Sequence, residues 1–477
     1  MTPGLDEDKF FIVGRGDIQA RHDPFFYLPK FVRLEQRVLK KTQLKLRDFI
    51  KALAGGATPR TEEQERYYAD SETGIPFVRV QNLSVSGELD LTDVKYINAE
   101  THNVLLARSQ VTENDLLVKI TGVGRMAVSS IPPLGFEGNI NQHIACIKTK
   151  NRHTSEILAA YLNTDIAESL AKRRSTGGTR PALDYGALRS IPIIEDERIL
   201  PAMTSAYTQY KRMLRQASKK LGEIDDYLLL ELGIILPAKP ENTIDNRLFS
   251  IPFRELTGNR FDPFFNNLPS IGLQQHLVAS GAVRLHSLVQ QITKGETPLW
   301  RGDDYQKEGI PFLRAQNISP DGLIGDVLKI DENVDKRMAR SKLFGGEILY
   351  TMAGTIGVSC IYPESLGRAN INQAIAKIVL NPSNEHLKYY LVEILNSTIC
   401  RRQAQRALTV AAQPNINFGQ IKSILIPLPK DEMVLDKIVE KCKSLRHQAQ
   451  QLREQAEAEL NQAKQQIESM LLGEANP

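Results

Sequence analysis

Apolar residues along this chain fall into short runs bounded by glycine and proline, and such runs are typical of β-strands. Each half of the sequence holds three: IPFVRVQNL, DLLVKITGVG and HIACIKT in the first, and IPFLRAQNI, EILYTMAG and AIAKIVL in the second. Helical spacing follows in SEILAAYLNTDIAESLAKR from Ser155 and in LKYYLVEILNSTICRRQAQRAL from Leu387. The pattern predicts a mixed α+β fold.

Two longer stretches repeat apolar residues every three or four positions, which predicts a long helix with one apolar stripe, as in a coiled coil. We expect Pro201 in the first turn of one helix, Pro237 and Pro240 beyond its end, and Asp431 and Glu432 at the start of the other. The stripes are Ile199, Met203, Ala206, Tyr210, Met213, Ala217, Leu221, Ile224 and Leu228, then Ile438, Cys442, Leu445, Ala449, Leu452, Ala456, Leu460, Ala463, Ile467 and Met470.

A helix of about 35 residues is roughly 50 Å long, too long to be hidden inside one globular domain. The economical solution is that the two stripes pack on each other. Because each helix follows a globular part, an antiparallel pair would place those parts at opposite ends of a rod.

The sequence also contains a long internal repeat. RHDPFF recurs as RFDPFF, Thr58-Pro59 as Thr297-Pro298, GIPFVRVQN as GIPFLRAQN, NINQHIA as NINQAIA, and TRPALDYGALRSIPI as AQPNINFGQIKSILIPLP. The five blocks keep their order, at offsets between about 231 and 239 residues, so each half is one copy of a duplicated domain and the chain is no short-period solenoid.

Composition narrows the class of protein. The 477 residues exceed one compact core, and the net charge of +4 is compatible with nucleic-acid binding without demonstrating it. No apolar stretch is long enough for a membrane span, and the N-terminus does not resemble a secretory signal. Four widely spaced cysteines predict reduced, mostly buried thiols. We expect a soluble, cytoplasmic protein without a membrane partner.

Taken together, these motifs resemble the DNA specificity subunits of type I restriction–modification systems. The resemblance rests on D-P-F-F at the start of each copy, GIPF(V/L)R(V/A)QN, a glycine loop after an apolar strand, NINQ, and P-x-(L/I)-(D/N)-(Y/F)-G before each long helix. It covers nearly the whole chain, twice over. Each piece alone is short and degenerate; their duplicated order is the specific signal.

The resemblance implies an α+β fold of two duplicated mixed α/β target recognition domains, joined by a pair of long antiparallel coiled-coil helices. The expected divisions are 1–194 and 237–429 for the recognition domains, and 195–236 and 430–473 for the spacer helices. It also implies that each domain reads one half of a bipartite site in double-stranded DNA. The helices would dock two adenine methyltransferase (modification) subunits, and restriction/translocase subunits would complete the complex.

The residues themselves give no sign of catalysis, so we expect no catalytic residue, no cofactor and no metal. There is no phosphate-binding G-x-x-x-x-G-K-(S/T) loop, and the eight histidines lack the spacing of metal ligands. The D-P-F-F segments resemble the D-P-P-(Y/F) motif of adenine methyltransferases but lack the second proline and a glycine-rich cofactor loop. We interpret them as packing turns in which the aspartate caps and both phenylalanines are buried.

Several polar residues have the chemistry for DNA contact, since cations and hydroxyls bind phosphates and side-chain amides read base edges. Each also has a plain structural interpretation, as a solvated helix end or a tight turn. The candidates are Lys172, Arg173, Arg174, Thr179 and Arg180 in the first copy, Arg401, Arg402, Arg406, Gln413 and Asn415 in the second, Lys119, Thr121, Arg125, Thr351 and Thr355 at the glycine loops, and Trp300 with Arg301.

Residues that read different half-sites are expected to differ between the copies. Arg79, Gln81 and Asn82 recur almost unchanged as Arg314, Gln316 and Asn317, so the structural interpretation is favoured for them. Specificity is instead expected in the divergent segments, 60–73 against 299–308 and 84–114 against 319–346. Exchanging these segments between the copies is predicted to change the DNA sequence that is recognised.

Three other interpretations remain open. The chain could serve another methyltransferase-based defence system that has no cleavage partner. It could be a coiled-coil scaffold whose two domains bind protein, in which case its binding would be insensitive to salt and DNA. It could also be an enzyme with an unfamiliar site, although no constellation of residues points to one.

Overall fold

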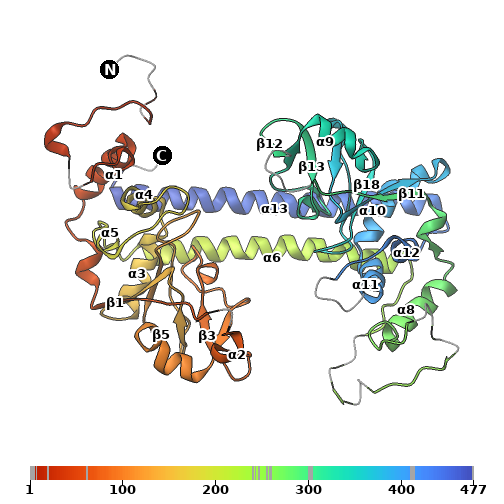
Figure 1. Ribbon diagram of the computed structural model, residues 1–477, viewed down its shortest axis with the longest axis horizontal. Helices are drawn as coiled ribbons and strands as arrows, with labels where there is room; N and C mark the ends of the chain where they lie inside the picture. The colour runs from red at the N-terminus through yellow and green to blue at the C-terminus, as the bar shows by residue number, and fades with distance from the viewer. Residues whose placement is uncertain are drawn as a thin grey trace. The chain divides into compact units, whose positions relative to one another are not determined.

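The computed structural model describes residues 6, 8–18, 21–60, 63–238, 241, 243–244, 248–253, 256, 260–298, 305–408 and 414–474. The chain forms two compact units, Met1–Leu214 with Glu454–Pro477, and Arg215–Arg453 (Figure 1). Each unit therefore contains one part of each long helix. The domain divisions expected from the sequence remain a prediction about function.

The first unit consists of short helices around two small sheets. Its helices are α1 (Pro29–Leu39), α2 (Gln64–Tyr67), α3 (Arg152–Leu162), α4 (Asp165–Arg174) and α5 (Tyr185–Arg189). Its strands are β1 (Ala52–Gly55), β2 (Tyr68–Ala69), β3 (Ile75–Val78), β4 (Lys95–Ile97), β5 (Gln110–Thr112), β6 (Leu116–Lys119), β7 (Ser129–Ser130), β8 (Glu137–Ile140) and β9 (Ile144–Lys148).

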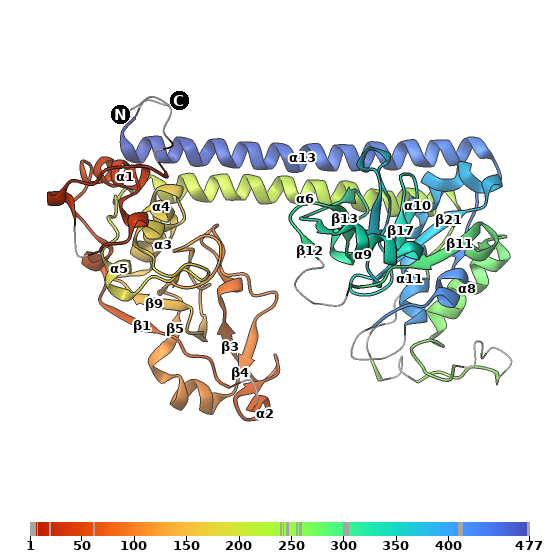
Figure 2. The same ribbon diagram turned by 45° about the horizontal axis from the view of Figure 1, so that its top comes forward.

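The two sheets of this unit differ in how they are buried. The antiparallel sheet β1-β9-β6-β7 places Val118 and Ile147 in one core with Leu158 and Tyr161 of α3. The sheet β2-β4-β3-β8-β5 is mixed, because β3 runs parallel to β8 with Phe77 opposite Asn139. Figure 2 shows β3 and β4 away from the long helices of this unit.

The second unit repeats this arrangement. Its elements are α8 (Leu268–Ala279), β10 (Val283–Arg284), β11 (Val289–Lys294), β12 (Tyr305–Gln306), β13 (Ile310–Leu313), β14 (Ile318–Ser319), β15 (Gly322–Leu323), β16 (Leu328–Ile330), α9 (Glu332–Arg337), β17 (Lys342–Leu343), β18 (Ile348–Thr351), β19 (Ser359–Ile361), β20 (Ala369–Ile371), β21 (Ile375–Leu380), α10 (Lys388–Asn396), α11 (Thr398–Ala407), α12 (Phe418–Lys422) and β22 (Leu425–Ile426).

Strand order shows that the two units are copies. The sheet β11-β21-β18-β19 matches β1-β9-β6-β7, and β12-β16-β13-β20-β17 matches β2-β4-β3-β8-β5. The parallel pair also recurs, with Phe312 opposite Asn370 as Phe77 is opposite Asn139. The predicted α+β class and the predicted duplication are therefore confirmed.

The helical patterns after the sheets form two helices in each copy, where the sequence showed one continuous pattern. In the first copy the break comes at Asn163-Thr164, where the Thr164 hydroxyl accepts a bond from the Ala167 N–H at 3.2 Å and starts α4. In the second copy it comes at Ser397, between α10 and α11. The Thr164 hydroxyl suits its N-cap because it satisfies an orphan backbone donor, whereas the Ser397 hydroxyl donates to the Ile394 carbonyl at 2.6 Å and caps nothing.

The two predicted long helices are α6 (Ile199–Glu231) and α13 (Glu432–Leu472). The starts agree with the sequence, since Pro201 lies in the first turn of α6 and Asp431 accepts a bond from the Met433 N–H. Pro237 does lie beyond the end of α6, but the helix ends several residues before it. Gly233, with φ of +62°, ends the helix before Pro237 is reached, as glycine does beyond many helix C-termini.

Within each unit the stripes of α6 and α13 pack together in antiparallel order. In the first unit Met203, Leu460 and Ile467 share a core, and Tyr210 donates to Glu457 at 2.7 Å. In the second unit, Ile224, Leu228, Ile438, Cys442 and Leu445 share a core, and Lys437 donates to Glu231 at 2.8 Å.

The D-P-F-F turns correct one expectation. Asp23 and Asp262 do cap, accepting bonds from the Phe26 and Phe265 N–H groups at 3.1 Å and 2.9 Å. Burial of both phenylalanines was wrong, because the first of each pair, Phe25 and Phe264, is about half exposed, at 46% and 50%.

All four cysteines are buried and free, as predicted. Burial raises the pKa of the Cys146, Cys360 and Cys442 thiols to about 12, which keeps them protonated. Within the described parts of the chain, no helix is long and apolar enough to span a membrane, and no group of acidic, histidine or cysteine side chains is arranged as a metal site.

Candidate nucleic-acid interface

In the first unit, the glycine loop after β6 lies beside a small hairpin of residues 176–182. The Gly122 N–H donates to the Pro181 carbonyl at 3.0 Å, and the Leu183 N–H donates to Ile120 at 2.8 Å. Thr176 and Ala182 exchange both backbone bonds and close the hairpin, whose tip carries the exposed Thr179 and Arg180. Two segments about 60 residues apart in sequence thus form one surface.

The loop itself is shaped by Lys119, a residue predicted either to bind DNA or to support structure. Its side chain is buried, and its Nζ donates to the Val123 carbonyl at 2.7 Å. Burial lowers the pKa of Lys119, while Glu168 opposes that shift. Lys119 therefore holds the loop, and the side chain of Val123, 76% exposed, stands at its tip.

The second unit builds the same feature with different chemistry. Thr351 replaces Lys119, and its buried hydroxyl donates to the carbonyl of Thr355, again four residues later. The Ile416 N–H donates to Met352 at 3.0 Å and brings Asn415 beside the loop. Thr355 and Asn415 are exposed. Matching loop tips therefore present valine in one copy and threonine in the other.

The backbone of the repeated NINQ motif packs closely against a glycine, Gly56 in the first copy and Gly295 in the second. A Cβ atom added to Gly56 would lie 2.1 Å from the Ile140 carbonyl oxygen, and one added to Gly295 would lie 1.8 Å from that of Ile371. Only glycine permits so close an approach of two backbones. His143, in the same loop, has its pKa lowered by burial and by the positive charge of Arg180.

Arg173 and Arg174 were candidates for phosphate contact, but the structure places both guanidinium groups in the interior. They surround the carboxylate of Glu35 on α1, Arg174 donating through two nitrogens and Arg173 through one. Arg173 also stacks on Phe26 at 4.2 Å and donates to its carbonyl at 2.9 Å. Burial would raise the pKa of Glu35, but the bonds and charges of Arg174 and Arg173 lower it below its ordinary value.

Arg406 is the counterpart of Arg173 and is also buried. It donates to the Phe265 carbonyl at 2.7 Å and stacks on that ring at 4.2 Å. Gln274 stands where the first copy has Glu35, and its amide donates to Gln403 at 3.2 Å. Arg173 and Arg406 therefore fasten the D-P-F-F turn of each copy to the helical layer, and Arg174 fastens α1 through Glu35.

The remaining candidates lie in mixed surroundings. Arg125 turns inward, donating to the Asn163 carbonyl at 2.6 Å and pairing with Glu168 at 2.9 Å. Lys172 is half exposed and pairs with Glu168 at 2.8 Å, and Arg402 donates to the Pro237 carbonyl at 2.7 Å. Thr121 and Arg401 are partly buried, and Trp300, Arg301 and Gln413 lie outside the described residues.

The asparagine of the repeated Arg-x-Gln-Asn motif has the structural role favoured from the sequence. The Asn82 amide accepts from the Arg79 N–H at 2.8 Å and donates to the Asp90 carbonyl at 2.9 Å. Asn317 does the same, accepting from the Arg314 N–H at 3.0 Å and donating to the Ile324 carbonyl at 3.1 Å. Both asparagines are buried and fix a turn.

Acidic residues of the long helices attach each globular part, and these were missed from the sequence. Glu468 of α13 accepts bonds from the Asp165 and Ile166 N–H groups at 2.6 Å and 3.1 Å, which caps α4. Asp225 of α6 accepts from the Thr398 N–H and hydroxyl, both at 2.7 Å, which caps α11. A signal exists: each acid directly follows an isoleucine of the stripe, near the end of its helix.

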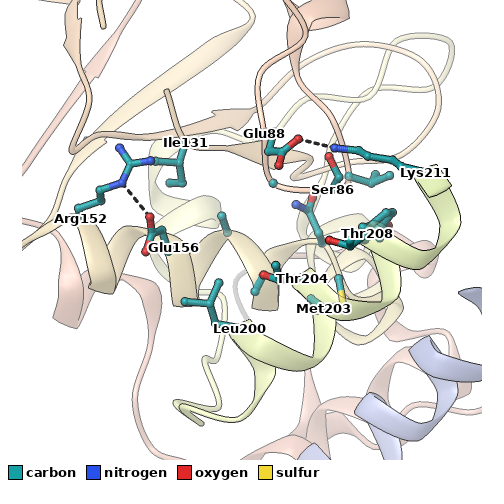
Figure 3. A pocket seen from close by; sticks show the side chains of 16 residues that line it. Ser86, Glu88, Ile131, Arg152, Glu156, Leu200, Met203, Thr204, Thr208 and Lys211 are labelled. Atoms are coloured by element: carbon teal, nitrogen blue, oxygen red, sulfur yellow. Dashed lines mark hydrogen bonds and ion pairs between the residues drawn. The ribbon is translucent and has the colours of Figure 1, made fainter. Parts of the chain in front are cut away.

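A second attachment joins the turn after the Arg-x-Gln-Asn motif to the helix that follows its own copy. In the first unit Lys211 of α6 pairs with Glu88 across a cavity of about 310 Å³, which Arg152 and Glu156 flank on its other side (Figure 3). In the second unit, Arg446 and Arg453 of α13 pair with Asp321 at 2.9 Å and 3.2 Å.

We predict that Asp225→Ala lowers the free energy of unfolding by about 1 kcal/mol, because the first N–H groups of α11 lose their cap. Urea denaturation of the whole chain measures the change. Asp226→Ala, at the exposed neighbouring position, is the matched control and is expected to change stability by less than about 0.5 kcal/mol. Equal effects of both substitutions would contradict the capping role.

Residues 282–462 match the family model described as the type I restriction modification DNA specificity domain. The type I restriction enzyme EcoBI specificity subunit of Escherichia coli is 30% identical over 134 residues, which are 28% of this chain and 27% of that protein. The chain resembles type I specificity subunits. The resemblance found in the sequence motifs is thus confirmed, although the aligned region spans about a quarter of that relative.

Structural comparison aligns this chain with several solved structures, among them a chain from a study of the assembly and conformational transition of the type I R-M system. It has 15% identity and a TM-score of 0.43, with 91% of this chain and 97% of that one covered. The S subunit from M. genitalium has 10% identity and a TM-score of 0.35, covering 90% and 95%. The HsdS subunit from Thermoanaerobacter tengcongensis has 14% and 0.30, also covering 90% and 95%.

Proposed function

We propose that this chain is the non-catalytic DNA specificity subunit of a cytoplasmic type I restriction–modification complex. One observation carries the proposal: residues 282–462 match a DNA specificity domain, and the first unit repeats the strand order of the same fold. Two such domains in one chain are suited to reading the two halves of a bipartite, asymmetric site in double-stranded DNA.

The proposed DNA-contacting surface of each unit is the glycine loop with the segment beside it, which is the hairpin of residues 176–182 in the first unit and the segment at Asn415 in the second. Thr179 and Arg180 are exposed on the hairpin of the first unit, and Thr355 and Asn415 are exposed beside the loop of the second. Cationic and hydroxyl groups suit phosphates, and an amide suits a base edge. We retain Thr121, Lys172, Arg401 and Arg402 as contacts at the margin of this surface. Six candidates are instead proposed to stabilise this surface from the interior of each unit: Lys119, Arg125, Arg173, Arg174, Thr351 and Arg406.

We further propose that α6 and α13 dock two adenine methyltransferase subunits, which restriction/translocase subunits join in the full complex. In the first unit these helices leave a groove of about 510 Å³. Several small residues lie among the larger ones that line it, which leaves room for side chains of a partner helix. They include Ala202, Ser205, Ala206 and Ala463. Adenine methylation requires flipping the base into a pocket, which the methyltransferase would provide.

The decisive test is a genome-wide map of N6-methyladenine in cells with this gene intact and deleted. Deletion is expected to remove one split motif with two unequal halves and a fixed gap. If the two maps are identical in cells where the partner methyltransferase is expressed and active, the proposal is overturned. Salt-insensitive binding of the purified complex, equal with and without DNA, would instead favour a protein scaffold.

We predict that Arg180→Ala weakens DNA binding without destabilising the fold, because Arg180 is exposed at the hairpin tip. Losing one phosphate contact is expected to reduce the slope of log K against log salt by about 0.9. Titration of the purified complex at several salt concentrations measures this slope. Arg198→Ala removes the same charge from an exposed residue that precedes α6 and pairs with Asp196, and it is expected to leave the slope unchanged.

A further inference from the structure

A buried polar residue occupies the same place in both recognition units, and the two residues differ in kind. His102 in the first unit is 1% exposed, and Asp335 in the second is 0% exposed. Each lies five residues beyond the end of a matching strand, β4 or β16. Both belong to the divergent segments 84–114 and 319–346, in which we expect DNA specificity to lie.

The contacts of His102 fix how its ring is used. Its Nδ1 lies 2.5 Å from Oδ1 of Asn139, whose amide is oriented because its Nδ2 donates to the Leu106 carbonyl at 2.9 Å. Nδ1 therefore carries a proton. On the other side, Nε2 lies 3.1 Å from Oε1 of Glu137 and 3.1 Å from the Gln110 amide nitrogen. The ring thus faces a carboxylate.

Asp335 meets the reverse chemistry. The Asn370 amide, counterpart of Asn139, turns its nitrogen inward and donates to Asp335 Oδ1 at 3.0 Å. Two cations face Oδ2, Lys342 Nζ at 3.5 Å and Arg368 Nε at 3.4 Å. In this unit a carboxylate faces cations.

The outer partners occupy equivalent positions. Glu137 opens β8 and Arg368 directly precedes β20, each two residues before the asparagine that contacts the buried group. Gln110 and Lys342 likewise match, at the starts of β5 and β17. The charge of the outer partner is therefore reversed between the copies, and so is the end of the asparagine amide that faces the buried group, whereas Gln110 and Lys342 both present N–H donors.

In each copy the buried residue and its outer charged partner come from different parts of the chain, the divergent segment and the shared sheet. His102 with Gln110, and Asp335 with Lys342, lie inside the divergent segments, whereas Glu137 and Arg368 lie outside them on the shared sheet. The side chain of Glu137 is 72% exposed at the rim. The energetic penalty of a mismatch would thus come from the buried member, which cannot be solvated when its countercharge is lost.

We propose that Glu137 and Arg368 are positioning residues that match each divergent segment to its own scaffold by charge. A segment moved to the other copy would place Asp335 opposite Glu137, with Lys342 of the same segment as its remaining countercharge, or would place His102 opposite Arg368. Both new pairings are repulsive when charged. The consequence for DNA specificity rests on the proposed function. The charge matching itself rests only on the contacts above.

The matching is tested in the whole chain without DNA. His102→Asp is expected to speed hydrogen exchange in residues 101–112 by about tenfold, and adding Glu137→Arg is expected to restore most of that protection, because contacting residues couple strongly. His102→Asn with Glu137→Arg is the control, with no buried carboxylate to pair. If Glu137→Arg changes exchange equally in the Asp and Asn backgrounds, the proposal is overturned.

The functional consequence is tested by replacing residues 84–114 with 319–346, with Glu137 either kept or changed by Glu137→Arg. We expect only the chimera with Glu137→Arg to methylate DNA efficiently, at a motif whose first half is altered. Equal methylation by both chimeras would overturn the matching. Coupling in hydrogen exchange with an unaltered motif would leave the matching intact and contradict the proposed role of the segments in reading DNA.

Discussion

Replacing Glu35 by alanine is expected to lower the free energy of unfolding of the first unit by about 3–5 kcal/mol, a large share of the stability of an ordinary domain. Glu35 is the carboxylate that Arg173 and Arg174 enclose. Removing it leaves two guanidinium groups buried without a countercharge, and their desolvation is then uncompensated. Denaturation in urea, with hydrogen exchange of peptides from α1 and α4, measures the loss and locates it.

The second copy supplies the matched control. Gln274→Ala changes the equivalent position, where no charge is lost, and is expected to cost much less than Glu35→Ala. If both substitutions lower the free energy of unfolding by similar amounts, packing stabilises this position and the ion pair does not. The pKa of Glu35 is lowered in the folded state, so its stabilisation is present above the ordinary glutamate pKa and is lost as the pH falls through the lowered value. Glu35→Ala is therefore expected to remove part of the acid sensitivity of the first unit.

The repeat explains why much of the fold could be predicted from this sequence. Strands β3, β6 and β9 are short apolar runs, and each was found twice, so a pattern that is ambiguous alone gained support from its counterpart. The long helices were predicted because their stripes persist over many turns. Their ends were less certain, since Gly233 stops α6 before the prolines that follow.

Side-chain roles were harder to predict, because a charged residue in a sequence carries no information about its burial. Arg173 and Arg174 were assigned to a basic surface, yet Glu35, more than 130 residues earlier, draws both inward. Lys119 and Thr351 share no chemistry but donate to carbonyl oxygens at the same place in the glycine loop. In the folded chain the two side chains occupy equivalent places and hold the glycine loop in the same way, which their chemistry alone does not reveal.

Two hydrogen-bonded caps, one in each unit, attach the globular parts to the long helices. Glu468 and Asp225 cap α4 and α11, and α4 leads directly into the hairpin that bears Thr179 and Arg180. The position of the proposed DNA-contacting surface is therefore tied to the helices by short, directional bonds. If the helices set the distance between two such surfaces, the separation of the half-sites follows from helix length.

Inserting one heptad into both helices is accordingly expected to widen the gap in the methylated motif by about 3 base pairs. Seven helical residues add about 10.5 Å, and stacked base pairs are about 3.4 Å apart. A heptad keeps the apolar stripes facing each other. The insertions belong after Leu214 in α6 and before Glu454 in α13, where each helix passes from one compact unit to the other. Sequencing of N6-methyladenine in cells that carry the variant reads the gap directly.

A heptad in α6 alone is the control for this ruler. It shifts one stripe against the other by two turns, so pairs such as Tyr210 with Glu457 and Lys437 with Glu231 can no longer form together. That variant is expected to lose methylation without acquiring a new gap. The double insertion preserves both sets of contacts and differs only in length. If it methylates the original motif with the original gap, the distance between half-sites is set elsewhere, and the helices hold the partner subunits without measuring DNA.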